Sequence, residues 1–234
     1  MRLRIVIVTA LTLAVLVPAG GATAAQNRRV LATGDSMIQY VDIALRDKLE
    51  PRHLRVRSDA HVGTGISKPR QFDWIGHARH LAHAYRPRAT VVFLGANEGF
   101  PLRWQGKRRN CCKRPWRRAY AARAQAMMRS LERDGAARVY WLTLPAARPH
   151  AWNRIYRAVN LALETAARRE EDNGVELLDM GAVFTPHGHF QQTIVRGGRR
   201  ISVRQSDGIH LNPAGARIAA SVVVRRMRRD KLFP

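Results

Sequence analysis

The stretch "ATVVFLG", residues 89 to 95, is an almost unbroken apolar run with the length of one β-strand. A strand with helices on both of its faces shows this pattern, because the side chains on both faces must then be apolar. Strands of this kind lie at the centre of parallel sheets. The stretch therefore predicts a buried parallel sheet, with strands and helices alternating on either side of it.

The rest of the chain has this alternation. Four further strand patterns occur at residues 28–33, 53–59, 138–145 and 175–180. Helical patterns cover residues 37–49, 72–85, 116–134, 152–172 and 213–229. Neighbouring parallel strands need a crossover, which is usually a helix. We therefore predict an α/β fold, a three-layer α/β/α sandwich with a mostly parallel central sheet of about five strands.

The first 25 residues have the order of a secretory signal peptide. "MRLR" is positively charged, an apolar run follows, and "GATAAQ" offers a cleavage site near Ala24 or Ala25. An uncleaved anchor is the alternative, but the apolar run of about 13 residues is short for a membrane span. We expect a signal peptide over residues 1–25, one domain over 26–234, a secreted or periplasmic location, and no transmembrane segment after cleavage.

The chain is strongly basic, with 41 Lys and Arg against 17 Asp and Glu and a formal net charge of +24. Loss of Arg2 and Arg4 with the signal peptide leaves 39 basic and 17 acidic residues, a charge of +22. This charge favours anionic partners such as a cell-wall polymer. No aromatic-interleaved basic motif or nucleic-acid-binding fold signature accompanies it, so we expect no specific nucleic-acid binding.

Two stretches interrupt the alternation. Residues 100–115 form a basic loop after the predicted central strand, and residues 188–205 look like a hairpin that turns at Gly197-Gly198. The loop contains the adjacent Cys111 and Cys112, which allow a vicinal disulfide, pairing between chains, or free thiols.

Four polar segments lie at strand ends or before the last helix. They are "GDS" (34–36), "HVGTGIS" (61–67), "GANEG" (95–99) and "SDGIH" (206–210). In an open α/β sheet, ligands bind beyond the carboxyl ends of the strands. A helix N-cap would explain Asp35 and Ser36 alone. It does not explain four such segments at one rim, and we interpret them together as an active site.

In this order, the four segments resemble the blocks of the SGNH hydrolases, also called the GDSL esterase superfamily. The matched positions are the nucleophile Ser36, the glycine Gly65, the asparagine Asn97, and the pair Asp207 and His210 in a D-x-x-H spacing. Gly63 is a close second for the glycine. The stretch "GISKPRQFDW" (65–74) resembles an exported bacterial branch of largely uncharacterised members. The resemblance spans about residues 30 to 225.

The resemblance implies a Ser36-His210-Asp207 triad that needs no cofactor. A serine hydroxyl becomes a good nucleophile when a base removes its proton, which would be the task of His210. Asp207 would hold the imidazole in the correct tautomer. The amides of Ser36 and Gly65 and the side chain of Asn97 would form the oxyanion hole. Glu98 departs from the family pattern, which usually has Asp after the Asn.

The leading hypothesis is a secreted serine esterase that hydrolyses acyl, above all acetyl, esters on a carbohydrate or cell-wall polymer. An O-acyltransferase would use the same acyl-enzyme. A basic module that binds an anionic polymer, with vestigial catalytic residues, is the third hypothesis. We expect Trp104 in the basic loop to contact substrate. His187 and His189 suggest a metal site only weakly, because no carboxylate pattern accompanies them, and no metal is expected.

Overall fold

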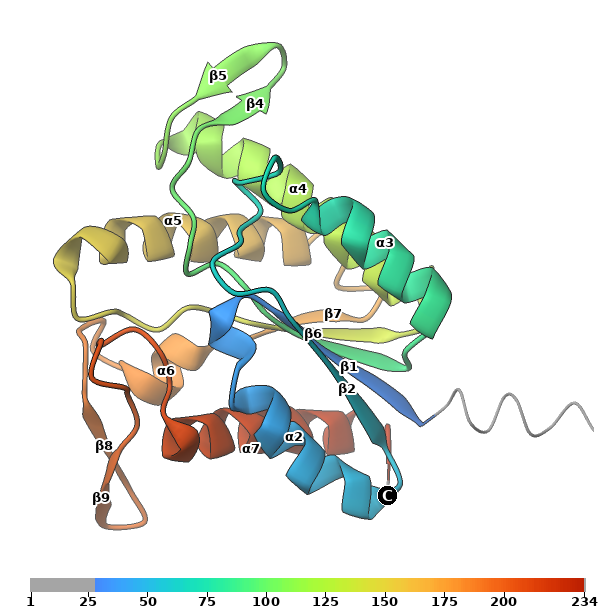
Figure 1. The fold of residues 1–234 in the computed structure, drawn as a ribbon, viewed down its shortest axis with the longest axis vertical. Coiled ribbons are helices and arrows are strands. Elements are labelled where there is room, and N and C mark those ends of the chain that lie inside the picture. Colours follow the sequence, from blue (N-terminus) through green and yellow to red (C-terminus); the bar gives the residue numbers. More distant parts are fainter. Residues whose placement is uncertain (1–27, 234) are drawn as a thin grey trace, which may run out of the picture.

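The central layer of the protein is a five-stranded sheet in the order β2-β1-β3-β6-β7. We describe it from a computed structural model, which covers residues 28–233 (Figure 1). The strands are β1 (Arg29–Gly34), β2 (Arg55–Ala60), β3 (Ala89–Phe93), β6 (Arg138–Leu142) and β7 (Val175–Leu178). Every neighbouring pair is parallel. The predicted parallel sheet is therefore confirmed.

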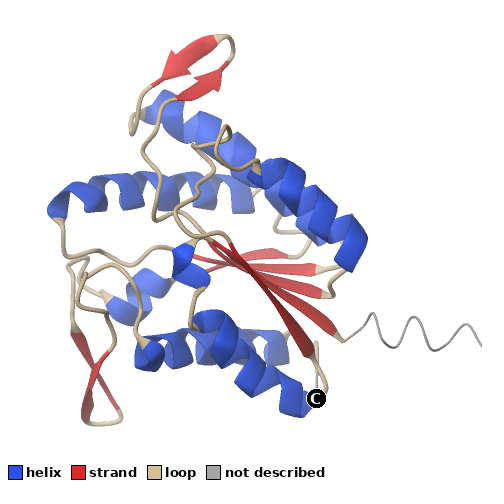
Figure 2. Ribbon diagram, viewed as in Figure 1, coloured by secondary structure: helices blue, strands red, loops and turns tan. Residues whose placement is uncertain are grey.

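Helices cover both faces of this sheet. Figure 1 shows α3 (Trp74–Tyr85), α4 (Arg114–Glu132) and α5 (His150–Ala167) on one face. The other face carries α2 (Val41–Leu49) and α7 (Pro213–Arg229), which contact each other, and the short α6 (Met180–Phe184) lies on the same side. The three-layer α/β/α architecture predicted from the alternating pattern is confirmed (Figure 2).

Strand β3 lies at the centre of the sheet, between β1 and β6. All five of its residues are buried, and Val91, Val92 and Phe93 have no exposed surface. Burial of such side chains contributes about 1.5–3 kcal/mol each to folding. The register aligns Gly34 of β1 with Phe93 of β3 and with Ala60 of β2. The polar segments that follow these three strands therefore begin at the same edge of the sheet.

The first predicted helix, 37–49, is wrong in its start. The chain forms a 3-10 turn, η1 (Ser36–Ile38), and α2 begins only at Val41. The side chain of Asp35 caps η1 by accepting a hydrogen bond from the amide of Met37, and Tyr40, with a positive φ of 62°, separates this turn from α2. A residue in that conformation ends a helix or a turn, so Ser36 lies in a short turn of its own. A second 3-10 turn, η2 (Glu50–Arg52), follows α2.

Both interruptions of the pattern contain antiparallel hairpins. The hairpin of β8 (Thr193–Arg196) and β9 (Arg199–Ser202) turns at Gly197-Gly198, as predicted. Residues 100–115 are not a plain loop, because β4 (Leu102–Trp104) and β5 (Lys107–Arg109) pair within them. Both hairpins project from the layered body in Figure 2. Cys111 and Cys112 form a vicinal disulfide, the first of the three alternatives.

Between residues 28 and 233, no helix has the length and apolar character that a bilayer crossing requires. The predicted signal peptide, residues 1–25, lies outside the described residues, and its cleavage stays a prediction.

Candidate active site

Ser36, His210 and Asp207 lie in one hydrogen-bonded row. The Nε2 atom of His210 is 2.7 Å from the Ser36 hydroxyl oxygen, and its Nδ1 atom is 2.5 Å from Oδ2 of Asp207. With the Nδ1 proton directed at the carboxylate, Nε2 is free to accept the hydroxyl proton. Ser36 follows β1, while the other two residues precede α7, with His210 174 positions further along the chain. The arrangement can activate a serine nucleophile.

The segment before α7 holds Asp207 and His210 in a tight turn. Oδ1 of Asp207 accepts hydrogen bonds from the amides of Ile209 (2.8 Å) and His210 (3.1 Å). Burial raises the pKa of the Asp207 carboxyl, but hydrogen bonds from the His210 ring and these amides outweigh burial and bring the pKa below its ordinary value. Asn212 then caps α7 through the amide of Gly215. Both side chains therefore come from one rigid turn, as the D-x-x-H spacing predicts.

A buried arginine that sequence reasoning missed supports this turn. Arg204 donates to the carbonyl oxygens of Ile209 (2.6 Å) and Ala146 (2.8 Å), and only 2% of it is exposed. Burial lowers the pKa of its guanidinium to about 10, so it stays protonated at neutral pH. Arg148 adds a bond from its amide to the carbonyl of Gly208. No local pattern in the sequence distinguishes Arg204 from the other arginines of this arginine-rich chain.

Asp35 connects the first and third polar segments. Its buried carboxylate accepts hydrogen bonds from the amides of Met37 (2.9 Å), Gly95 (3.0 Å) and Ala96 (2.9 Å), and from Nδ2 of Asn97 (3.2 Å). Complete burial raises the pKa of Asp35, although these amides act against that rise. Asp35 is therefore the cap of η1 and also a clamp between β1 and β3. Ser36 is left free to face His210.

Glu98, the departure from the family pattern, connects the second and third segments. Its Oε1 accepts from the amide of Ile66 (2.7 Å) and from the hydroxyl of Tyr120 (3.1 Å), and its Oε2 accepts from the amide of Ser67 (2.8 Å). Burial raises the pKa of this carboxyl. The glutamate thus holds the turn that contains the candidate glycine beside the segment that contains Asn97.

The two candidate glycines have different surroundings. Gly65 is buried, and a Cβ added to it would lie 2.9 Å from Oε1 of Glu98. Gly63 has a positive φ of 77°, and no atom lies within 4 Å of an added Cβ. The absence of a side chain at position 65 therefore makes room for Glu98, which is a packing reason that sequence analysis did not foresee. Gly63 is the glycine with open space beside it.

Trp104 is not among the side chains that meet at Ser36. It is partly buried in β4, and Figure 1 shows the β4–β5 hairpin projecting from the α3–α4–α5 layer, away from η1. Its contact with substrate stays a prediction.

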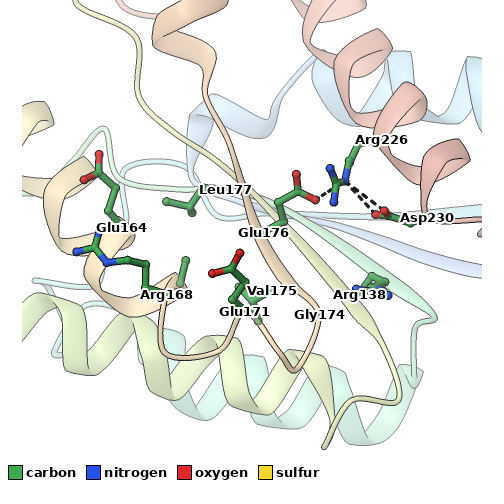
Figure 3. A pocket seen from close by; sticks show the side chains of 11 residues that line it. Arg138, Glu164, Arg168, Glu171, Gly174, Val175, Glu176, Leu177, Arg226 and Asp230 are labelled. Carbon is green, nitrogen blue, oxygen red and sulfur yellow. Dashed lines mark hydrogen bonds and ion pairs between the residues drawn. The ribbon is translucent and has the colours of Figure 1, made fainter.

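A pocket of about 400 Å³ lies at the opposite end of the sheet (Figure 3). It is lined by the first residues of β6 and β7 and by the ends of α5 and α7. Arg226 in this pocket forms ion pairs with Glu176 (2.5 Å) and Asp230 (3.2 Å), so these three charged groups already have partners. None of the candidate catalytic residues lines it.

Asp59, His61 and His77 form a cluster at the end of β2 that sequence analysis missed. Their ligand atoms all lie within 4.8 Å of one another, and theirs is the one group of three or more possible metal ligands within residues 28–233. His187 and His189 do not belong to it. The spacing of Asp59 and His61, two residues apart where β2 ends, is the signal that could have found it, because such side chains share a side of a strand.

Comparisons with known proteins give one family and one fold. A model of the family described as protein of unknown function (DUF459) matches residues 29–226. A comparison with curated proteins finds no match.

Solved structures with the same fold include a lipase/acylhydrolase from Enterococcus faecalis, which is 15% identical, covers 87% of this chain and 96% of its own, and has a TM-score of 0.60. An acetyl xylan esterase from Geobacillus stearothermophilus is 14% identical, with 86% and 94% covered and a TM-score of 0.54. A member of the lipolytic G-D-S-L family from Veillonella parvula is 14% identical, with 86% and 98% covered and a TM-score of 0.53. The predicted SGNH fold is confirmed.

Proposed function

Because this chain belongs to the DUF459 family and has the fold of the SGNH hydrolases, we propose that it is a serine esterase. The observation that carries the proposal is the row of Ser36, His210 and Asp207, with 2.7 Å between His210 Nε2 and the Ser36 hydroxyl oxygen. The esterases and lipolytic proteins among the solved structures of this fold support the same reaction class.

The reaction proceeds through an acyl-serine. His210 accepts the hydroxyl proton as the Ser36 oxygen bonds to the ester carbonyl carbon, and the proton then passes to the departing alcohol when its bond to that carbon breaks. A water molecule repeats these steps and releases the acid, with Ser36 protonated again. Asp207, with its lowered pKa, is ionised and stabilises the imidazolium that forms in each half.

The oxyanion hole is formed by the amide of Ser36, the side chain of Asn97 and a glycine amide, from Gly65 or from Gly63. A side-chain amide has two N–H groups. Asn97 gives one to Asp35, which orients the group, and the second is available for the oxyanion. Loss of one such donor costs about 10²–10³ in kcat.

The proposed substrate is an acyl ester, above all an acetyl ester, on a carbohydrate or cell-wall polymer. Three features support it: the predicted signal peptide over residues 1–25, the charge of +22 that remains after its removal, and an acetyl xylan esterase among the proteins of this fold. Export would place the remaining domain, 26–234, in the periplasm or outside the cell, where wall polymers occur. Trp104 is the proposed contact for a distal part of such a polymer.

The test is hydrolysis of p-nitrophenyl acetate and butyrate by residues 26–234, beside Ser36→Ala and His210→Ala. We expect each substitution to lower kcat by about 10⁴-fold or more. Ser130→Ala is the matched control, because the Ser130 hydroxyl bonds only within α4, and it should leave the rate unchanged. A parent that neither hydrolyses these esters nor reacts at Ser36 with a fluorophosphonate probe, by intact mass, would refute the proposal.

The same protein and variants also distinguish the esterase from two alternative functions. An O-acyltransferase would acylate an added oligosaccharide while release of free acid falls. A binding module with vestigial residues would show salt-dependent polymer binding and no reaction at Ser36. The departure at Glu98 does not favour the binding module, because the glutamate accepts three hydrogen bonds that hold the site segments together.

A further inference from the structure

We propose that Asp59, His61 and His77 bind one divalent transition-metal ion, with Zn²⁺ the preferred ion. The cluster is separate from the Ser36-His210-Asp207 row, and the proposal does not depend on hydrolysis. Its members come from two elements: Asp59 lies in β2 and His61 just beyond it, while His77 lies in the first turn of α3.

The distances between the ligand atoms fit one small ion. Nε2 of His61 is 3.2 Å from Nε2 of His77 and 3.3 Å from Oδ1 of Asp59, and Nε2 of His77 is 3.2 Å from the same Oδ1 atom. A tetrahedral Zn²⁺ with bonds of about 2.0–2.1 Å keeps its ligand atoms about 3.3 Å apart. The three atoms therefore already form a face of nearly the required size.

Hydrogen bonding alone satisfies this arrangement poorly. A neutral imidazole has one N–H, and a nitrogen that donates to the carboxylate cannot also donate to the other ring. If both Nε2 atoms carry hydrogens for Asp59, the two N–H groups face each other at 3.2 Å. A metal ion takes the lone pairs of both rings and of the carboxylate together, and so removes this conflict.

The donor set indicates the class of ion. Two imidazoles and one carboxylate are ligands typical of Zn²⁺, whereas Mg²⁺ and Ca²⁺ prefer oxygen ligands throughout. The side chains of His61, His77 and Asp59 are 31%, 22% and 11% exposed, so an ion can enter from solvent. Three protein ligands leave a fourth position for water.

Neighbouring side chains hold the ligands in place before any ion binds. The Thr33 hydroxyl donates to Oδ2 of Asp59 at 2.7 Å, an outer contact of the kind that orients ligating carboxylates. The ring of Phe72 lies 4.1 Å from that of His61, and Trp74 meets the same ring edge-on at 5.5 Å. These contacts restrict the rotation of His61.

The ion would restrain the turn that carries the candidate glycines. The amide of His61 donates to the carbonyl of Gly34 (2.8 Å), two residues before Ser36, and the hydroxyl of Thr64 donates to the carbonyl of His61 (2.6 Å). A metal bound at His61 therefore fixes the start of residues 61–67 against β1. The proposed role is structural, next to the site but not within it.

The experiment is titration of chelator-treated residues 26–234 with ZnSO₄ by calorimetry, with Tm measured in parallel. We expect one Zn²⁺ per chain, and at 100 times Kd a Tm increase of about 5–11 °C. His61→Ala and His77→Ala should each weaken binding by about 100-fold or more, a loss at least as large as that caused by mutating an outer contact. Asp59→Asn, which keeps the shape of the side chain, should also weaken the binding of Zn²⁺.

His80→Ala is the matched control, because His80 is an exposed histidine three residues further along α3. It should bind Zn²⁺ as the parent does. Metal-free Tm values of the variants near that of the parent show that they fold. The proposal is overturned if the parent binds no stoichiometric Zn²⁺, if the His61→Ala/His77→Ala double variant binds it equally well, or if His80→Ala loses as much affinity.

Discussion

Substitution of Asp35 by asparagine tests whether this residue is a cap or a clamp. Asparagine caps a helix about as well as aspartate does, so a residue that only capped η1 would tolerate the change. The carboxylate of Asp35, however, accepts four hydrogen bonds, three of them from the segment of Gly95 to Asn97. An asparagine has one oxygen for these donors and an NH₂ group that accepts none.

The loss of stability in Asp35→Asn depends on which of its two orientations the asparagine side-chain amide adopts, and we take the more favourable one. With the oxygen toward Gly95, Ala96 and Asn97, the NH₂ group faces the amide of Met37, and two buried donors lose their partners. Each costs about 1–3 kcal/mol. Loss of a buried charge, whose pKa burial raises, offsets part of this sum. We expect a net loss of about 2–4 kcal/mol in the free energy of unfolding, or about 4–16 °C in Tm for a domain of this size.

Thermal melts and ester hydrolysis together measure the effect. Because the clamp orients Asn97 and precedes Ser36, kcat should fall about 10- to 100-fold, less than the loss of an oxyanion donor outright. Asp73→Asn is the matched control, since Asp73 caps α3 through the amide of Gly76 only, and it should shift Tm by little. An Asp35→Asn variant with the Tm and kcat of the parent would show that the clamp reasoning is wrong.

Two further substitutions examine the other supports of the site. Glu98→Gln should lower stability by about 1–3 kcal/mol, since one amide of Ile66 or Ser67 would face an NH₂ group. Burial raises the pKa of Glu98 above its ordinary 4.5, so folding favours the protonated form of the carboxyl. The Tm advantage of the parent over Glu98→Gln should therefore be largest below pH 4.5 and shrink as the pH rises through the pKa of the folded state. A constant advantage from pH 4 to 8 would contradict this. Arg204→Met removes the donors to the carbonyls of Ile209 and Ala146. It should lower kcat about tenfold or more with a smaller change in KM, and Arg204→Lys should restore part of the loss. An unchanged kcat in Arg204→Met would exclude a positioning role.

The sheet and the pairing of Asp207 with His210 could be predicted because both depend on short-range patterns, whereas the approach of Ser36 to His210 was expected only from the resemblance to the SGNH hydrolases. The apolar run at β3 and the D-x-x-H spacing of Asp207 and His210 each fix a local geometry that the fold preserves. The predicted start of the first helix was wrong, because Asp35 caps η1 as a separate turn and the positive φ of Tyr40 lies between that turn and α2.

Residues that act through distant partners could not be predicted. The role of Arg204 depends on carbonyl groups of two other segments, and the packing of Gly65 on Glu98 joins residues 33 apart in the chain only after folding. The cluster of Asp59, His61 and His77 needs α3 to bring its third member to the end of β2. The spacing of Asp59 and His61 marks two members of this cluster, but the contacts of Arg204, Gly65 and His77 follow from tertiary packing and leave no periodic signal in the sequence.

The separation of Ser36 and His210 by 174 positions also has a consequence for biosynthesis. At about 5–20 residues per second, the ribosome adds the histidine about 10–35 s after the serine. If His210 is the base of Ser36, as we propose, the serine has no base until the chain has been made as far as residue 210. Under the proposed mechanism, turnover would require a chain synthesised at least as far as His210 and would therefore report on a nearly complete polypeptide.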